Sequence, residues 1–244
     1  GNMTLLMPVP QVDAILESIY RYKARWILGV PALYRMILEN DRLPRYNLSS
    51  LTYCYCGGDV LPLEVFNRWK EHTGVPIYQV YGSTEAGHVT YSRIGKEPKA
   101  NTIGVPLKSR KCLLVDPDSL EPVAQGETGE LLVTSPYTLK EYWKKPEETA
   151  RSYVKINDAI YYRMGDYMKQ DADGDLIYVE RSADIIKHKA FRVSASEVEA
   201  VLQDHPTVIG ACVVGVPDVK VGERIKAIVV LKEGARGVGG AELL

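Results

Sequence analysis

Near the start of the chain, apolar side chains recur at the three- and four-residue spacing of an amphipathic helix. Between residues 11 and 23 the apolar positions are Val12, Ile15, Leu16, Ile19 and Tyr20. Pro10 and Pro31 each stand where proline favours the first turn of a helix. The pattern therefore predicts helices over residues 11–23 and 31–38, joined by a short strand or turn.

The next segments alternate between strand and helix patterns. Residues 50–56 alternate apolar and polar side chains and stop at Gly57-Gly58, which predicts a strand and then a turn. Residues 62–73 place apolar side chains on one side of a helix that Gly74 would close in the left-handed conformation. Residues 76–81 form the next strand pattern. Strand, helix and strand at this spacing predict a parallel α/β sheet.

The pattern then changes to short β runs. Between residues 94 and 163 there are many turn residues and hardly any helical period, and the clearest strand patterns are 111–115 and 130–134. We expect a small β-rich, barrel-like lobe in this part of the chain.

Residues 183–244 combine one helix pattern with two strand patterns. Ser194-Ala195-Ser196-Glu197 has the form of a capping box, which predicts a helix that runs to His205 before Pro206 stops it. Strand-like runs follow over 210–216 and 224–231. The expected fold class is thus α/β: a parallel-sheet subdomain, a β-barrel-like lobe and a truncated small α+β C-terminal domain.

Composition excludes several classes of partner. The 244 residues are 45% hydrophobic and 25% charged, and 30 basic against 31 acidic residues leave a formal net charge of −1. This balance favours neither nucleic-acid binding nor a polybasic membrane anchor. The longest apolar runs, 211–216 and 225–231, are too short to span a bilayer, so we expect a cytoplasmic protein. No pattern predicts an oligomeric state.

Four scattered cysteines lack the paired spacing of a zinc or thiol redox site. They are Cys54, Cys56, Cys112 and Cys212. We expect all of them to be buried apolar residues, and the first two to share one face of a strand.

The strongest local candidate for chemistry is Tyr81-Gly82-Ser83-Thr84-Glu85, at the carboxyl end of a predicted parallel strand, where open α/β sheets bind ligands. A glycine admits a phosphate close to the backbone, a hydroxyl can donate to its oxygens, and a carboxylate can hold magnesium. The alternative is a polar turn in which Thr84 and Glu85 cap a following helix. His88 could line an acid pocket near this turn or could be a surface or core histidine.

Two further motifs are polar. Tyr162 to Asp166 precedes Asp171 to Asp175, whose composition suits a hairpin turn better than a calcium loop. Glu180 to Lys187 is a charged run with a basic tail, and taken alone it is typical of a solvated loop.

Taken together, these motifs closely resemble the family of acyl-CoA synthetases, luciferases and peptide-synthetase adenylation domains, and fatty acyl-CoA ligases most of all. The resemblance rests on Gly29-Val30-Pro31, Gly57-Gly58, Tyr81 to Glu85, Gly165-Asp166, Arg181, Lys187 and Glu197-Val198-Glu199. It implies an acid-thiol ligase that uses ATP and Mg²⁺ to convert a carboxylic acid, expected to be a fatty acid, to an acyl adenylate. The acyl group would then pass to coenzyme A.

The resemblance also implies residue roles. Adenine would be held by Gly57, Gly58 and Tyr81, and the phosphates would be contacted by Gly82, Ser83 and a catalytic Thr84, while Glu85 would bind magnesium and act in catalysis. The ribose hydroxyls would be accepted by Asp166 beside Arg181, with weaker nucleotide contacts from Tyr178 and Arg192. Thioester formation would be assisted by Lys187.

Two positions depart from the family pattern. Ala183 stands at the hinge position, where a charged residue is usual, and Ala190 stands where many relatives have glycine. The resemblance implies that residues 1–182 are the C-terminal half of a large adenylating domain, divided near residue 93, and that 183–244 are the hinge and part of a small domain. The upstream phosphate loop and the downstream catalytic lysine would be missing, so we expect this fragment alone to be inactive.

Two alternatives stay open. One is an adenylate-only activator that passes its acyl group to a carrier protein or an amine instead of coenzyme A, and Ala190 is the residue that keeps this alternative open. The other is a non-catalytic binding module. The sequence predicts no acyl chain length.

Overall fold

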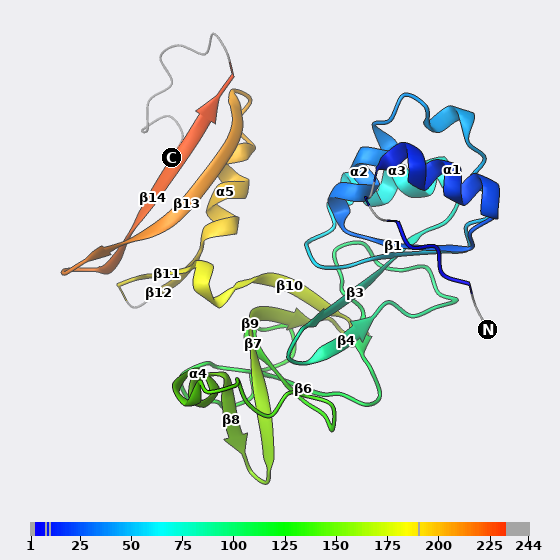
Figure 1. Ribbon diagram of the computed structural model, residues 1–244. Helices are drawn as coiled ribbons and strands as arrows, with labels where there is room; N and C mark the ends of the chain where they lie inside the picture. Colours follow the sequence, from blue (N-terminus) through cyan, green and yellow to red (C-terminus); the bar gives the residue numbers. More distant parts are fainter. Residues whose placement is uncertain (1–2, 8, 10, 190, 233–244) are drawn as a thin grey trace. The chain divides into compact units, whose positions relative to one another are not determined.

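The computed structural model describes residues 3–7, 9, 11–189 and 191–232 (Figure 1). These residues form two compact units. The first comprises the described residues up to Met164 together with 168–178, and the second comprises 165–167 and the described residues from Val179.

The first unit begins with a five-stranded sheet in the order β1-β2-β3-β4-β5. Its strands are β1 (Trp26–Gly29), β2 (Tyr53–Cys56), β3 (Ile77–Ser83), β4 (Gly87–Tyr91) and β5 (Val105–Pro106). Strands β1, β2 and β3 are parallel, as predicted. Strands β4 and β5 are antiparallel additions, so the sheet is mixed.

Three helices cover one face of this sheet and confirm the helix predictions (Figure 1). They are α1 (Val12–Tyr22), α2 (Pro31–Leu38) and α3 (Leu63–Thr73), and a short 3-10 turn, η1 (Leu43–Arg45), follows α2. Gly74 ends α3 with a φ of 71°, the predicted left-handed cap. Pro10 lies outside the described residues.

The core beneath these helices is aromatic as well as aliphatic. Tyr34 of α2 and Trp69 of α3 are fully buried and meet edge to face, with ring centroids 4.7 Å apart. The Tyr34 hydroxyl donates to the Tyr55 carbonyl at 2.7 Å, which satisfies its polar end. Cys54 and Cys56 lie in the same core, on one face of β2, as expected.

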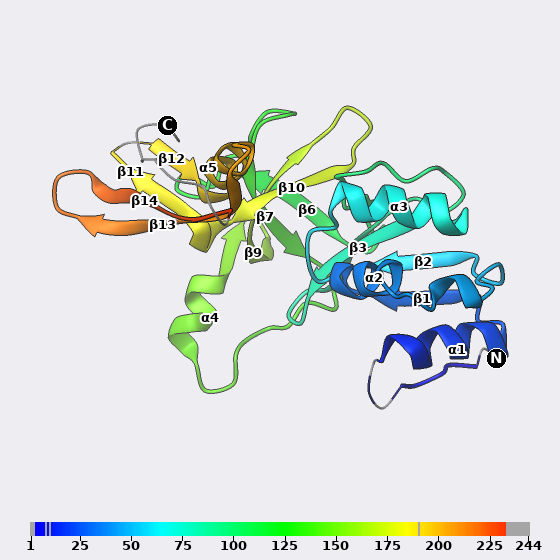
Figure 2. The same ribbon diagram turned by 90° about the horizontal axis from the view of Figure 1, so that it is seen from above.

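The β-rich lobe is built on a second sheet, in which β10, β9, β7 and β6 lie in that order and β8 pairs with β9. Its elements are β6 (Lys111–Val115), β7 (Gly129–Thr134), α4 (Pro146–Ser152), β8 (Tyr153–Ile156), β9 (Ala159–Gln170) and β10 (Leu176–Arg181). The predicted strands over 111–115 and 130–134 are confirmed. Helix α4, at the edge of the lobe in Figure 2, was not predicted, because it buries none of its residues.

The acidic run between β9 and β10 is a hairpin turn, as predicted. The Asp171 amide donates to the Asp175 carbonyl at 3.0 Å. Cationic side chains contact the carboxylates: Lys99 lies 2.6 Å from Asp171, and Arg93 lies 2.6 Å from Asp175. Protein cations thus neutralise the carboxylates that a calcium ion would need.

The second unit contains a four-stranded antiparallel sheet in the order β12-β11-β14-β13. Its elements are η2 (Ser182–Asp184), β11 (Ile185–His188), β12 (Phe191–Ser194), α5 (Ala195–Gln203), β13 (Val208–Asp218) and β14 (Gly222–Leu231). The Ser194 hydroxyl accepts from the Glu197 amide at 3.1 Å, so the predicted cap is confirmed. The helix ends at Gln203, before the predicted His205.

Two sequence-based expectations are wrong in this unit. The charged run Glu180 to Lys187 is not a solvated loop, because it belongs to β10, η2 and β11, and Glu180 is buried and accepts from the Ser196 amide at 3.1 Å. Cys212 is exposed rather than buried, because its neighbour Val213 occupies the face of β13 that packs in the core with α5.

No helix in the described parts of the chain combines the length and the apolar character that a membrane span requires.

Candidate functional site

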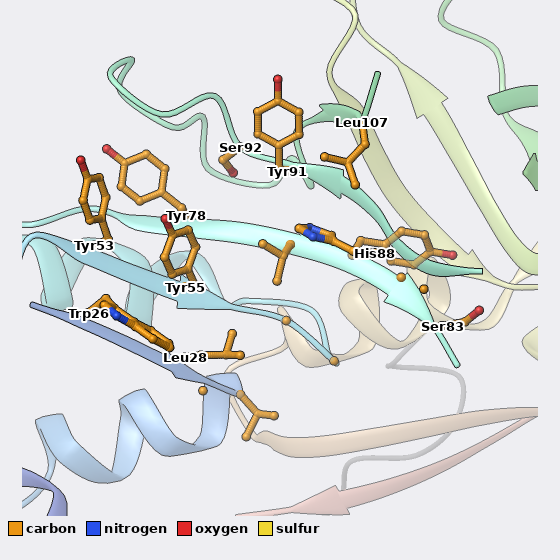
Figure 3. A pocket seen from close by; sticks show the side chains of 18 of the residues that line it. Trp26, Leu28, Tyr53, Tyr55, Tyr78, Ser83, His88, Tyr91, Ser92 and Leu107 are labelled. Carbon is orange, nitrogen blue, oxygen red and sulfur yellow. The ribbon is translucent and has the colours of Figure 1, made fainter. Parts of the chain in front are cut away.

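A cavity of about 1250 Å³ lies on the face of the first sheet opposite the three helices (Figure 3). Side chains alternate along the strands, so Ile27 and Cys54 enter the core while their neighbours Trp26 and Tyr53 line the cavity. The parallel strands β1, β2 and β3 thus provide its floor.

One wall of the cavity is aromatic. Figure 3 shows Trp26, Tyr53, Tyr55 and Tyr78 on the same side of the strands. The rings of Tyr53 and Tyr55 stack with centroids 6.3 Å apart, and the Tyr55 and Tyr78 centroids are 6.1 Å apart. Flat apolar walls of this kind suit an aromatic ring or an acyl chain.

The polar part of the cavity is formed by residues that the sequence had singled out. Six of these residues line the cavity. They come from the turn after β2, from the end of β3 and from the position after it, and they are Gly57, Gly58, Tyr81, Gly82, Ser83 and Thr84. His88 of β4 is exposed and also lines the cavity, so a core position for it is wrong. The structure thus brings two distant segments of the sequence to one place.

Residues 84–86 form a tight turn between β3 and β4. The Ser83 hydroxyl accepts from the Ala86 amide at 3.1 Å, and β4 starts at Gly87. The alternative in which Thr84 and Glu85 cap a following helix is therefore wrong. A register shift between Tyr81 and Gly82 turns this end of β3 relative to β4.

Neighbouring backbone requires glycine at two of these positions. A β-carbon at Gly57 would lie 2.7 Å from the Val80 carbonyl oxygen, and one at Gly82 would lie 2.1 Å from that of Gly87. Strand packing alone therefore demands glycine at both positions. Gly58 has a φ of +88°, which strains any other residue.

Two tyrosines lie beside Glu85: Tyr162, which begins one of the sequence motifs, and Tyr142, which no motif contains. The Tyr142 hydroxyl donates to Glu85 Oε1 at 2.9 Å, and the Tyr162 hydroxyl lies 3.3 Å from that of Tyr142. Partial burial alone would raise the pKa of Glu85, but hydrogen bonds led by that from Tyr142 lower it on balance. No spacing in the sequence links Tyr142 to a residue 57 positions earlier.

The turn has the donor chemistry of a magnesium site that is completed by phosphates. Mg²⁺ prefers oxygen ligands and is commonly bound through one or two carboxylates together with substrate phosphates. Glu85 supplies one ionised carboxylate beside the hydroxyls of Ser83 and Thr84. Within the described residues no group of three or more histidine, cysteine, aspartate or glutamate side chains could hold a metal by itself.

The second unit contains the predicted carboxylate and arginine pair. Asp166 of β9 is 3% exposed, and its Oδ1 lies 3.4 Å from Arg181 Nε of β10. The Arg181 side chain is 70% exposed. A buried carboxylate beside an exposed guanidinium can accept two hydroxyl groups while its charge is balanced.

Lys187 and Arg192 are Cα partners across the β11–β12 hairpin, and both are exposed. The hairpin thus carries two cationic side chains at paired positions. Ala190, between them in the chain, lies outside the described residues. Ala183 falls within η2. Tyr178 is a partly buried residue of the first unit and packs in the same core cluster as Tyr81.

Two family models match parts of the chain. A family model described as AMP-binding enzyme matches residues 1–143, and one described as AMP-binding enzyme C-terminal domain matches residues 197–243. The chain is 34% identical to a long-chain-fatty-acid–CoA ligase of Bacillus subtilis, over 97% of this chain and 42% of that protein. It is 33% identical to a benzoate–CoA ligase of Thauera aromatica, over 96% and 44%.

A solved structure of similar fold is that of ATP-bound MatB from Rhodopseudomonas palustris, with a TM-score of 0.83 and 27% identity. The match covers 98% of this chain and 46% of that one. The chain thus spans less than half the length of each of these relatives.

Proposed function

The chain belongs to the AMP-binding enzyme family, and on that premise we propose that the protein joins a carboxylic acid to AMP and then transfers the acyl group to coenzyme A. The products would be acyl-CoA, AMP and pyrophosphate. One observation carries the proposal: residues from the turn after β2 and from the end of β3 meet at one cavity that has a polar end and an apolar wall.

In the first step a carboxylate oxygen attacks the α-phosphorus of ATP, and pyrophosphate leaves. The Tyr81 ring stacks on adenine, Gly57 and Gly58 flank it, and the Ser83 and Thr84 hydroxyls donate to phosphate oxygens beside Gly82. These donors stabilise negative charge that builds up during displacement. Glu85 holds Mg²⁺, which supplies positive charge beside the phosphates when it is bound.

In the second unit we propose a ribose contact, on the family resemblance. Asp166 accepts the two ribose hydroxyls, and Arg181 balances its charge. Tyr178 of the first unit and Arg192 of the second make weaker nucleotide contacts. We assign residues 1–182 to the adenylating domain and 183–244 to the hinge and small domain, with Ala183 at the hinge.

Lys187 is proposed to assist the second step, in which the thiol of coenzyme A attacks the acyl adenylate and AMP leaves. Its exposed ammonium group beside Arg192 suits an anionic partner such as coenzyme A. Coenzyme A-dependent turnover that is unchanged in Lys187→Ala would remove this residue from the mechanism.

We propose a fatty acid as the substrate, on the strength of the Bacillus subtilis relative and the apolar wall of the cavity. An aromatic acid is the second candidate, because Trp26, Tyr53, Tyr55 and Tyr78 could stack on a ring and a relative is a benzoate–CoA ligase.

The test is a substrate panel with the full protein. We expect fatty acids to support AMP release faster than benzoates, and coenzyme A to stimulate that release. A preference for benzoates would replace the fatty-acid assignment. Adenylate formation without stimulation by coenzyme A would favour the adenylate-only alternative, whereas no acid-dependent reaction at all would favour a binding module.

A further inference from the structure

We propose that Tyr142 is a positioning residue that orients the Glu85 carboxylate toward the metal-bound phosphates of the nucleotide. The inference rests on the proposed function, because it takes Glu85 as the magnesium ligand. It adds to that function a residue far from the turn in sequence, in the segment between β7 and α4.

The tyrosine hydroxyls in this cluster gather around the Glu85 carboxylate. A phenol has one proton, and Tyr142 donates it to Glu85 Oε1 at 2.9 Å. The Tyr162 hydroxyl lies 3.3 Å from that of Tyr142, and its proton can go to the Tyr142 oxygen or to the Glu85 carboxylate. In either arrangement Tyr162 adds a second phenol donor to the cluster around the carboxylate.

Tyr142 is itself held in place. Its backbone amide donates to Thr149 Oγ1 of α4 at 3.0 Å, and the Thr149 hydroxyl donates to the Lys145 carbonyl at 2.8 Å. The same segment contacts the backbone of the turn, where the Leu139 amide donates to the Glu85 carbonyl at 2.9 Å. Both the main chain and the side chain of Glu85 are thus tied to one segment.

This arrangement fits a metal-binding carboxylate. One oxygen of Glu85 is fixed by a hydroxyl, which limits rotation of the carboxylate and sets the direction of its other oxygen. Outer hydrogen bonds of this kind orient metal ligands, and their removal typically costs about 10- to 100-fold in metal affinity or activity.

Tyr153 provides a matched control. Its ring packs against that of Tyr162 with centroids 5.3 Å apart, so it belongs to the same cluster. Its buried hydroxyl has no hydrogen-bond partner among the described residues. Tyr153→Phe and Tyr142→Phe remove the same atom from two rings that pack against one core cluster, but only the second change removes a bond to Glu85.

The experiment uses Mn²⁺ as the probe, with a non-hydrolysable ATP analogue and the full protein. Electron paramagnetic resonance measures the affinity for the metal–nucleotide complex, and a separate titration without metal measures the affinity for the nucleotide. We expect Tyr142→Phe to weaken metal–nucleotide binding about tenfold and to leave metal-free binding unchanged. Tyr153→Phe should match the wild type in both titrations.

Pyrophosphate exchange gives a second measurement. The Mg²⁺ concentration for half-maximal exchange should rise in Tyr142→Phe, while the KM for the acid stays unchanged. Equal metal–nucleotide affinity in Tyr142→Phe and wild type, or an equal loss with and without metal, would overturn the assignment and leave the proposed function standing. A wild-type protein that binds no metal–nucleotide complex would overturn both.

Discussion

The four cysteines differ in the expected reactivity of their thiols, because their surroundings differ. Burial raises the pKa of the Cys54 thiol to about 11 and those of Cys56 and Cys112 to about 12, whereas Cys212 is exposed. The thiolate is the reactive form. We therefore expect iodoacetamide at about pH 8 to alkylate Cys212 first, as measured by mass spectrometry of digested protein. Labelling of Cys54 as fast as that of Cys212 would contradict this burial pattern.

At this scale the sequence identifies local chemistry better than distant partners. Ser83, Thr84 and Glu85 are neighbours in the chain, so their composition alone suggested a phosphate and metal turn. Tyr142 could not be predicted, because its bond to Glu85 depends on how the segment after β7 returns to the turn. Gly57 was predicted for a ligand reason, but the Val80 carbonyl already demands it.

At the scale of elements, a buried ion pair joins β7 and β9. Glu130 accepts from Arg163 Nε at 2.9 Å and from Arg163 Nη2, and the Glu130 side chain is 4% exposed. Arg163→Met would leave a buried carboxylate without this partner. We expect a loss of about 3 kcal/mol in the free energy of unfolding, at the lower end for buried pairs because Arg163 is partly exposed.

Urea unfolding of the same protein measures this loss, and Arg68→Met is the control. Arg68 pairs with Glu64 on the surface of α3, where both side chains are largely exposed. Such a pair contributes little to stability, because water and salt screen its charges. If the two variants unfolded at the same urea concentration, the ion pair would not hold the two strands together.

The elements that could be predicted are those whose own residues encode them. Helix α2 has the predicted bounds, because apolar spacing and a proline at its first position coincide. Helix α4 buries no residue, so its sequence shows no regular spacing of apolar side chains. Strand β3 extends to Ser83, past the predicted end, because Gly82 and Ser83 pair with β4, an antiparallel partner that local patterns do not reveal.

At the scale of the whole molecule, the candidate residues divide between two units. Tyr81 to Glu85 belong to the first, and Asp166, Arg181 and Lys187 belong to the second. The order of the α/β, β-rich and α+β parts along the chain could be predicted, because the spacing of apolar residues differs from one part to the next. The assignment of all these residues to one nucleotide depends on family resemblance and is the central proposal.

ATP–pyrophosphate exchange tests that proposal most directly, in the full protein with its preferred acid. We expect Glu85→Ala and Asp166→Ala each to slow exchange at least about tenfold, the effect of losing one charge-stabilising contact. Glu64→Ala, on the exposed surface of α3, should leave exchange unchanged. Near-normal exchange in both site variants would contradict the assignment of these carboxylates to the nucleotide.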